Sequence, residues 1–172
     1  QDSSSAASDV YKRQHKENVR GANFHRNDDK ILSWSSDGTA TLWNLKGEVE
    51  VNFKHRQAVN GAIFHPYDDK ILSRSSDGAY LWNMDGELLS LMRHTSTMEG
   101  AMFNSTGDQI LTWGRDGWAI IWDLHGTELA TMKHKAGVFR AAFNETGDKV
   151  LSLSSDNHAI LWDVDGESNQ TM

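Results

Sequence analysis

The sequence predicts an all-β protein built from four similar four-stranded sheets. His15, His55, His94 and His134 begin segments of similar sequence, at successive spacings of 40, 39 and 40 residues. Each segment contains short runs rich in Val, Ile, Phe, Trp and Thr, which favour strands, and no run is long enough for a helix. Repetition at this period is typical of architectures in which neighbouring units share a core.

The first segment shows how each unit divides into four strands. The expected strands are VRGANFH (19–25), ILSWS (31–35), ATLWNL (40–45) and EVEVNF (48–53). Between the second and third strands lies a turn pair that tolerates positive φ, and this pair is Asp37-Gly38, Asp77-Gly78, Asp116-Gly117 or Asp156-Asn157. A second turn joins the third strand to the fourth, at Lys46-Gly47, Asp85-Gly86, His125-Gly126 and Asp165-Gly166. Each unit is therefore an antiparallel meander.

The composition excludes several classes of function. Of the 172 residues, 38% are hydrophobic and 24% charged, which is the balance of a globular protein. No apolar run approaches the roughly 20 residues of a transmembrane helix, and the first residues lack a secretory signal. Without cysteine there is no disulfide, thiol catalysis or thiolate metal site. The net charge of −7 argues against nucleic-acid binding, and a cytoplasmic location is expected.

The four units resemble the repeats of the WD-repeat β-propeller family. The resemblance rests on the initial His, the SDG turn and the pair that closes the third strand: Trp43-Asn44, Trp82-Asn83, Trp122-Asp123 and Trp162-Asp163. It covers residues 15–172 and implies four propeller blades, at 15–54, 55–93, 94–133 and 134–172. Residues 1–14 match no repeat and are expected to be a non-native or disordered leader.

The resemblance also implies a hydrogen-bonded network of His, Ser or Thr, Asp and Trp within every blade. Blade by blade, these residues are His15, Ser33, Asp37 and Trp43; His55, Ser73, Asp77 and Trp82; His94, Thr112, Asp116 and Trp122; and His134, Ser152, Asp156 and Trp162. The second unit has one residue fewer between Asp77 and Trp82, so the least regular network is expected there.

Side chains suited to catalysis or metal binding recur without forming a unique site. Ser, His and Asp are the parts of a hydrolytic triad, but four copies at a fixed period favour a structural role. The eight histidines include no HxH or HxxxH pair, so no metal and no cofactor are expected. Trp34, Trp113 and Trp118 lie outside the repeated Trp position, and packing between blades is favoured over a ligand platform.

In the family, partners bind at the face around the central channel. The corresponding positions lie three and five residues after each His and immediately before each Asp. The first set is Asn18, Ala58, Thr97 and Gly137; the second is Arg20, Asn60, Glu99 and Phe139; the third is Ser36, Ser76, Arg115 and Ser155. These residues differ between copies and offer a mixture suited to a protein or peptide.

The function expected from these features is a non-catalytic scaffold that binds another protein, with no enzyme activity. Two alternatives remain open: a small-ligand or enzymatic propeller that uses the channel, and a sensor domain detached from a larger signalling protein. Fold alone does not choose among them.

Four blades also raise the question of how the end faces are covered. An open arc would expose apolar sheet faces at both ends. The sequence allows a closed four-bladed ring, two chains that share one eight-bladed ring, or a fragment of a longer chain. Because the repeat stays in phase to its end at ESNQTM, a homodimer that forms an eight-bladed propeller is expected.

Overall fold

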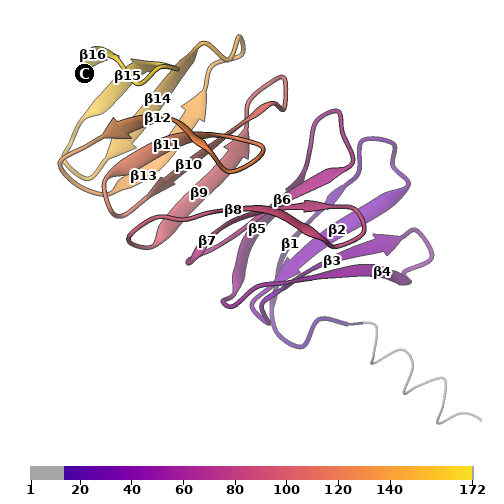
Figure 1. The fold of residues 1–172 in the computed structure, drawn as a ribbon. Coiled ribbons are helices and arrows are strands. Elements are labelled where there is room, and N and C mark those ends of the chain that lie inside the picture. Colours follow the sequence, from indigo (N-terminus) through magenta and orange to yellow (C-terminus); the bar gives the residue numbers. More distant parts are fainter. Residues whose placement is uncertain (1–13, 172) are drawn as a thin grey trace, which may run out of the picture.

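A computed structural model describes residues 14–171 and divides them into four separate four-stranded antiparallel sheets (Figure 1). Each sheet is a meander in which strands adjacent in sequence are hydrogen-bonded neighbours. We call the sheets blades 1 to 4. Residues 1–13 of the predicted leader, and Met172, lie outside the described residues.

The sixteen strands follow the predicted units closely. Blade 1 contains β1 (Val19–Phe24), β2 (Lys30–Ser35), β3 (Thr39–Asn44) and β4 (Val49–Lys54). Blade 2 contains β5 (Val59–Phe64), β6 (Lys70–Ser75), β7 (Gly78–Asn83) and β8 (Leu88–Met92). Blade 3 contains β9 (Met98–Phe103), β10 (Gln109–Gly114), β11 (Trp118–Asp123) and β12 (Glu128–Lys133). Blade 4 contains β13 (Val138–Phe143), β14 (Lys149–Ser154), β15 (Ala159–Asp163) and β16 (Ser168–Thr171).

The turn between the second and third strands has two forms. In blades 1, 3 and 4 the residue after the Asp adopts positive φ: 80° at Gly38, 84° at Gly117 and 68° at Asn157. In blade 2 the missing residue shortens the turn, so that Gly78 joins strand β7 and pairs with Ser75. The sequence difference between the units is therefore absorbed locally, and the sheet register continues unchanged on either side.

The blades stack face to face, and each pair of neighbours shares an apolar core. In the first junction, Leu32 and Leu42 of blade 1 pack with Ile71 and Trp82 of blade 2, and all four are buried. The second and third junctions repeat this arrangement with other apolar residues. Because side chains alternate along a strand, each blade turns one face to the preceding blade, its leading face, and the other to the next, its trailing face.

Large side chains on the second strand fit against glycines on the first. A Cβ atom at Gly21 would lie 2.3 Å from the Trp34 ring, and one at Gly100 would lie 1.9 Å from the Trp113 ring. Both indoles pack against junction cores, and Trp118 packs against the core between blades 2 and 3. Of the two interpretations of these tryptophans, the structure therefore favours packing between blades over a ligand platform.

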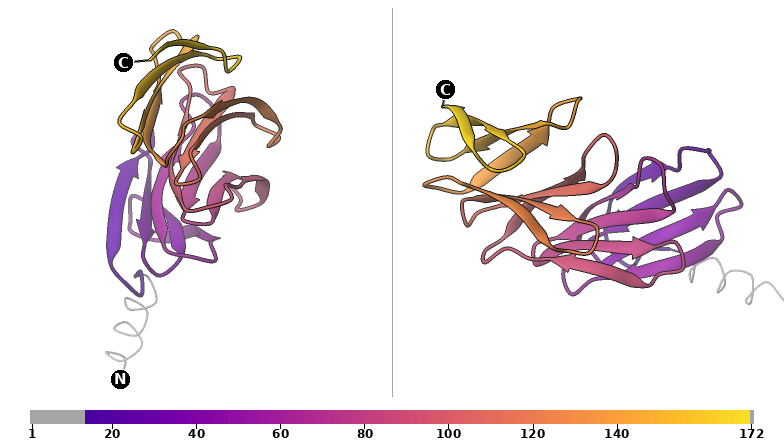
Figure 2. Two further views of the ribbon diagram at one scale, coloured as in Figure 1. Left: turned by 90° about the vertical axis from the view of Figure 1, so that its left-hand side faces the viewer. Right: turned by 45° about the horizontal axis from the view of Figure 1, so that its top comes forward.

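The stack is an open arc, with blades 1 and 4 at opposite ends (Figure 2). Val19, on the leading face of blade 1, is 58% exposed, whereas Val59 and Val138 at the same position are fully buried. Leu151, on the trailing face of blade 4, is 39% exposed, while Leu111 at the same position in blade 3 is fully buried. The alternative in which the four blades of one chain close a ring is therefore wrong.

Across residues 14–171, no helix has the length and apolar character needed to cross a membrane.

Candidate protein-interaction face

A β-bulge lies at the same place on the first strand of every blade. In blade 1 the pairing shifts between Val19 and Gly21, which leaves Arg20 without a direct partner on the second strand. The same shift isolates Asn60 in blade 2, Glu99 in blade 3 and Phe139 in blade 4. Bulges redirect a side chain away from its regular alternation and are common beside functional sites. The second set of predicted channel-face positions thus consists of the bulged residues.

The turn residue before each Asp lies next to the loop that enters the blade. The backbone N–H of Ser36 donates to the carbonyl of Asn18 at 2.9 Å, and Arg115 and Ser155 make the same bond to Thr97 and Gly137 at 2.9 and 3.0 Å. In blade 2 the shortened turn changes this contact, and the carbonyl of Ser76 accepts from the N–H of Met98 at 3.1 Å.

Side-chain contacts link the bulged residues to the turns and to neighbouring blades. The guanidinium of Arg20 donates to the Ser36 hydroxyl at 2.8 Å and reaches across the first junction to the side-chain oxygen of Asn60. The guanidinium of Arg115, 69% exposed, donates to the carboxylate of Glu99. We call the surface formed by these bulged and turn residues the channel face. It carries charges that are paired within the chain and still open to solvent.

A hollow of about 410 Å³ opens on the channel face between blades 3 and 4. Its walls are formed by Glu99, Arg115, Gly137, Val138, Phe139 and Ser155. Phe139 is 56% exposed, although large aromatic side chains are usually well buried. The structure therefore brings five of the predicted channel-face residues together in one hollow, while Arg20, Ser36 and Asn60 form a second group between blades 1 and 2. Ala58 stands apart, half-buried in the loop before blade 2.

Arg74 is a contributor to this face that sequence reasoning missed. It occupies the second-strand position of Trp34 and Trp113, and its guanidinium donates to the backbone carbonyl of Glu99 at 2.9 Å. Burial lowers the pKa of Arg74 from its ordinary value, although the nearby Glu99 opposes the shift. Arg74 holds the bulged Glu99 in place from the neighbouring blade. The available signal was a charged residue at a position that holds Trp34, Trp113 and Leu153 in the other blades.

The His, Ser or Thr, Asp and Trp side chains are hydrogen-bonded in blades 1, 3 and 4. In blade 3, the Trp122 indole donates to the Thr112 hydroxyl at 2.7 Å, and that oxygen lies 2.9 Å from His94 Nε2. His94 Nδ1 lies 2.9 Å from the Asp116 carboxylate. If the indole and Nδ1 are donors, the hydroxyl donates to Nε2 and the imidazole is neutral. Blades 1 and 4 repeat these contacts through Ser33 and Ser152.

This order of contacts is the same as in a hydrolytic triad, but the hydroxyl is differently placed. Thr112 and Ser152 are fully buried, and the oxygen of each accepts a hydrogen bond from an indole. A nucleophilic hydroxyl must instead have a lone pair facing the substrate. In blades 1, 3 and 4 the network joins the loop before the first strand to the second strand, the turn that follows it and the third strand.

The Asp carboxylates of the network are held ionised by their partners. Burial opposes ionisation of Asp116, but its hydrogen bonds from His94 and from the backbone N–H groups of Trp118 and Thr95 outweigh burial and lower its pKa. The Thr95 N–H donates to this carboxylate at 2.8 Å. In blades 1, 3 and 4 the Asp thus fixes the loop that precedes the first strand to the turn that follows the second.

Blade 2 departs from the expected network. Asp77 accepts from the Tyr80 hydroxyl at 2.7 Å and from the Ser75 hydroxyl, while His55 Nδ1 lies 3.2 Å from the carbonyl of Phe53. The prediction that Asp77 joins His55 in this blade is therefore corrected: the shortened turn places Tyr80 where it supplies the donor. His55 Nε2 and the Trp82 indole still meet at the Ser73 hydroxyl, each at 2.7 Å.

The pKa values of His55 and Tyr80 in blade 2 are both shifted in these surroundings. Burial lowers the pKa of His55 to about 4, against weaker opposing contacts from Phe53, Gly38 and Asp77. Burial, together with the hydrogen bond to Asp77 and the charge of that carboxylate, raises the pKa of Tyr80 to about 12. His55 is therefore neutral over most of the range in which an ordinary histidine becomes protonated.

Replacing Tyr80 with phenylalanine is expected to destabilise the protein by about 1 kcal/mol, because Asp77 loses a hydrogen-bond donor. The raised pKa of Tyr80 makes a contribution to stability that is present below pH 10 and is lost as the pH rises toward 12. A spectrophotometric titration of tyrosinate should show a late component that disappears in Tyr80→Phe. A titration unchanged by the substitution would contradict this assignment.

Among the described residues, no group of three or more His, Asp or Glu side chains is arranged to hold a metal ion.

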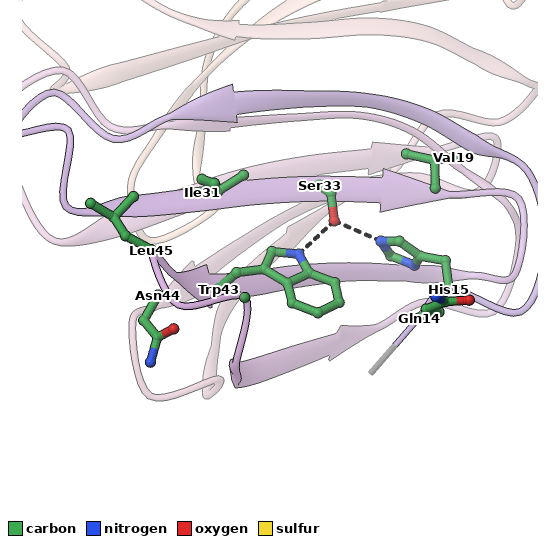
Figure 3. A pocket seen from close by; sticks show the side chains of 9 residues that line it. Gln14, His15, Val19, Ile31, Ser33, Trp43, Asn44 and Leu45 are labelled. Atoms are coloured by element: carbon green, nitrogen blue, oxygen red, sulfur yellow. Dashed lines mark hydrogen bonds between the residues drawn. The ribbon is translucent and has the colours of Figure 1, made fainter. Parts of the chain in front are cut away.

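In blade 1 the network lies beside the open end of the arc. Figure 3 shows Ser33 between the Trp43 indole and the His15 ring, with hydrogen bonds of 2.7 Å to each. These side chains line a hollow on the leading face, together with Val19, Ile31 and Leu45. The corresponding tryptophans of the other blades are at most 7% exposed because the preceding blade covers them.

Comparison with known proteins accounts for these repeated features. Residues 9–44 and 126–163 match the family described as WD domain, G-beta repeat, and the matched segments end at the pairs Trp43-Asn44 and Trp162-Asp163. The two segments end in blades 1 and 4, and blades 2 and 3 have the same strand order and the same indole–hydroxyl contact. The two matched segments are thus similar to WD40 repeats. WD40 domains generally serve as protein-interaction scaffolds. The comparison with curated proteins yields no match.

Proposed function

We propose that this chain is a non-catalytic WD40 scaffold that binds a protein or peptide through its channel face. The observation that carries the proposal is the bulge shared by all four blades. It turns Arg20, Asn60, Glu99 and Phe139 out of the regular strand alternation at equivalent places. A repeated backbone device that presents four different side chains suits recognition, because the scaffold stays constant while the chemistry varies.

The hollow between blades 3 and 4 supports a peptide as the ligand. It combines an exposed aromatic ring, Phe139, with the exposed Arg115. Aromatic and arginine side chains dominate the binding energy of protein interfaces. Glu99 pairs with Arg115 in the unbound chain, so an acidic group on the partner would compete with Glu99 for the guanidinium. We therefore expect a peptide with an apolar residue close to an acidic one.

A non-catalytic role is supported by the position of the repeated hydroxyls. In blades 2, 3 and 4, Ser73, Thr112 and Ser152 are fully buried and bonded to tryptophan. The contact of indole, hydroxyl and imidazole recurs in all four blades. An enzyme instead needs one site at which donors, base and nucleophile converge on a substrate.

Selection of peptides from a random displayed library on the full chain would test this function. For the selected peptides, Arg115→Glu and Phe139→Ala are each expected to weaken binding by roughly tenfold or more, since truncating such anchors typically costs above 1 kcal/mol. Calorimetry would measure the dissociation constants. The matched control is Arg26→Glu, because Arg26 is an exposed arginine that lies after β1, at the opposite end of that strand from Arg20.

Two results would argue against the proposal. The first is a library that yields no peptide of measurable affinity. The second is a set of peptides whose affinity falls with Arg26→Glu but not with Arg115→Glu or Phe139→Ala, because binding would then lie outside the channel face.

A further inference from the structure

The leading face of blade 1 contains an apolar hollow of about 490 Å³ (Figure 3). Trp43 and Ile31 form its floor, and Val19 and Leu45 stand at its sides. Val19 is 58% exposed, Phe24 on the same strand is 64% exposed, and Leu45 is 61% exposed. Monomeric proteins rarely leave so many large apolar side chains open on one face. The leading face of blade 1 therefore resembles one side of the apolar core that two neighbouring blades share.

The three junctions between blades show what fills such a hollow. Trp82 stands where Trp43 does, and Phe53 from the outer strand of blade 1 packs on it with ring centroids 5.6 Å apart. Leu32 and Leu42 of blade 1 complete that cover, and both are at most 1% exposed. At every inner junction the cover comes from the trailing face of the preceding blade.

The turn glycines show independently that no outer strand lies against the leading face of blade 1. A Cβ atom at Gly86 would lie 2.9 Å from Val51, and one at Gly126 would lie 3.2 Å from Ser90, in each case on the outer strand of the preceding blade. At Gly47, the same position in blade 1, no atom lies within 4 Å. Space for an adjoining outer strand is thus present at the leading face of blade 1.

The trailing face of blade 4 carries the complementary chemistry. Leu151 and Leu161 stand where Leu32 and Leu42 stand in blade 1. Leu151 is 39% exposed and Leu161 is half-buried, although their counterparts in the inner blades are buried. The outer strand differs, because Gln170 replaces the smaller Val51, Ser90 and Ala130. The apolar contact of this face therefore comes from β14 and β15.

We propose that the leading face of blade 1 binds the trailing face of blade 4 of a second copy of this chain. The chain itself carries an open leading face and an open trailing face. At its three inner junctions, apolar side chains at the positions of Leu151 and Leu161 pack against the leading face of the next blade. Two such contacts, each made by a different face of each copy, close a symmetric ring of eight blades. The interface is separate from the channel face and stands without the peptide-binding function.

Light scattering during size-exclusion chromatography of the full chain would test the proposal. At micromolar concentration we expect twice the chain mass of 19.3 kDa. Val19→Asp on the leading face and Leu151→Asp on the trailing face should each give a monomer, because a carboxylate would be buried in an apolar contact. Both side chains are exposed in the single chain, so its folding should survive, which circular dichroism would verify.

Mixing the two variants distinguishes this contact from other modes of dimerisation. Each variant retains one intact face, and only the pairing of blade 1 with blade 4 lets the two intact faces meet. An equimolar mixture is therefore expected to form a one-to-one heterodimer from two monomeric proteins. The matched control, Leu129→Asp, changes a leucine that is 50% exposed on the outer strand of blade 3 and should leave the dimer intact.

Several outcomes would overturn the inference. A monomer at all concentrations would do so, since the end faces would then remain open or be covered within the chain. A dimer that survives both single substitutions would place the contact elsewhere. Loss of the dimer in Arg115→Glu but not in Val19→Asp would place the dimer contact on the channel face. Failure of peptide binding with an intact dimer would contradict only the proposed function.

Discussion

Replacing Trp122 with alanine is expected to destabilise the protein by about 3–5 kcal/mol, the range for removing a large aromatic side chain from a core. Trp122 is 5% exposed, lies in the core between blades 2 and 3, and donates to the buried Thr112 hydroxyl at 2.7 Å. The alanine variant loses this packing, leaves a cavity between two blades and deprives Thr112 of its donor. Urea unfolding followed by circular dichroism would measure the difference.

Trp43 offers a matched control within the same chain. It has the same place in its blade and donates to Ser33 at the same distance of 2.7 Å, but no blade covers it. Trp43→Ala is therefore expected to cost only about 1–2 kcal/mol under conditions where the chain is monomeric. Equal losses for the two variants would contradict the view that burial by the preceding blade, and not the hydrogen bond, supplies most of the stabilisation.

Lowering the pH from 7 to 5 is expected to remove about 2 kcal/mol of stability through His55 alone. Its pKa is lowered from 6.5 to about 4 because the ring is buried. The unfolded chain binds a proton as the pH falls through 6.5, whereas the folded chain does not bind one until about pH 4. The stabilisation is therefore present above pH 6.5 and is lost progressively between pH 6.5 and pH 4.

The structural cause of this sensitivity lies in the surroundings of His55. The rings of Tyr80 and Trp82 lie with centroids 4.6 and 5.5 Å from the imidazole, and Nδ1 faces the Phe53 carbonyl. In the other three blades an Asp carboxylate faces the corresponding nitrogen. A positive charge on His55 therefore lacks the hydrogen-bonded carboxylate that the other three histidines have.

Urea unfolding at several pH values would measure this effect in the wild type and in His55→Gln. The variant should lose about 2 kcal/mol of the pH dependence between pH 7 and pH 5. His125→Gln is the control, because His125 is exposed in a turn. A His55 ring that titrates near pH 6.5 by nuclear magnetic resonance, or an unchanged pH dependence in His55→Gln, would show that the prediction is wrong.

The sequence predicted the blades because their signals are local and occur four times. The second strand expected at 31–35 is observed as Lys30–Ser35, and the turn pairs lie where the strands reverse. A run of alternating apolar residues bounded by Asp-Gly specifies a hairpin from the chain's own backbone preferences. Because the unit occurs four times, sequence features that all four units share can be distinguished from features of a single unit.

The sequence could not reveal the bulges on the first strands. Arg20 and Phe139 differ in size, charge and β-propensity, so they share no residue type that would mark an irregular pairing. The bulge arises from the pairing of the first strand with the second, which depends on the whole sheet. Likewise, the sequence shows that one residue is missing between Asp77 and Trp82. It does not show that the Tyr80 hydroxyl replaces the His55 ring as the partner of the Asp77 carboxylate.

For this protein the sequence by itself determined the number of blades, their order and the His, Ser or Thr and Trp that meet inside each one, because these depend on contacts within about 40 residues. Only the tertiary structure decided which faces are covered. Val19 and Val59 are the same residue at the same place in the repeat, yet one is 58% exposed and the other is fully buried. Val59 is covered by a preceding blade, whereas no blade precedes Val19 in the structure. Burial by a neighbouring sheet cannot be predicted from the sequence of a single repeat, because it depends on which other sheet lies against that repeat.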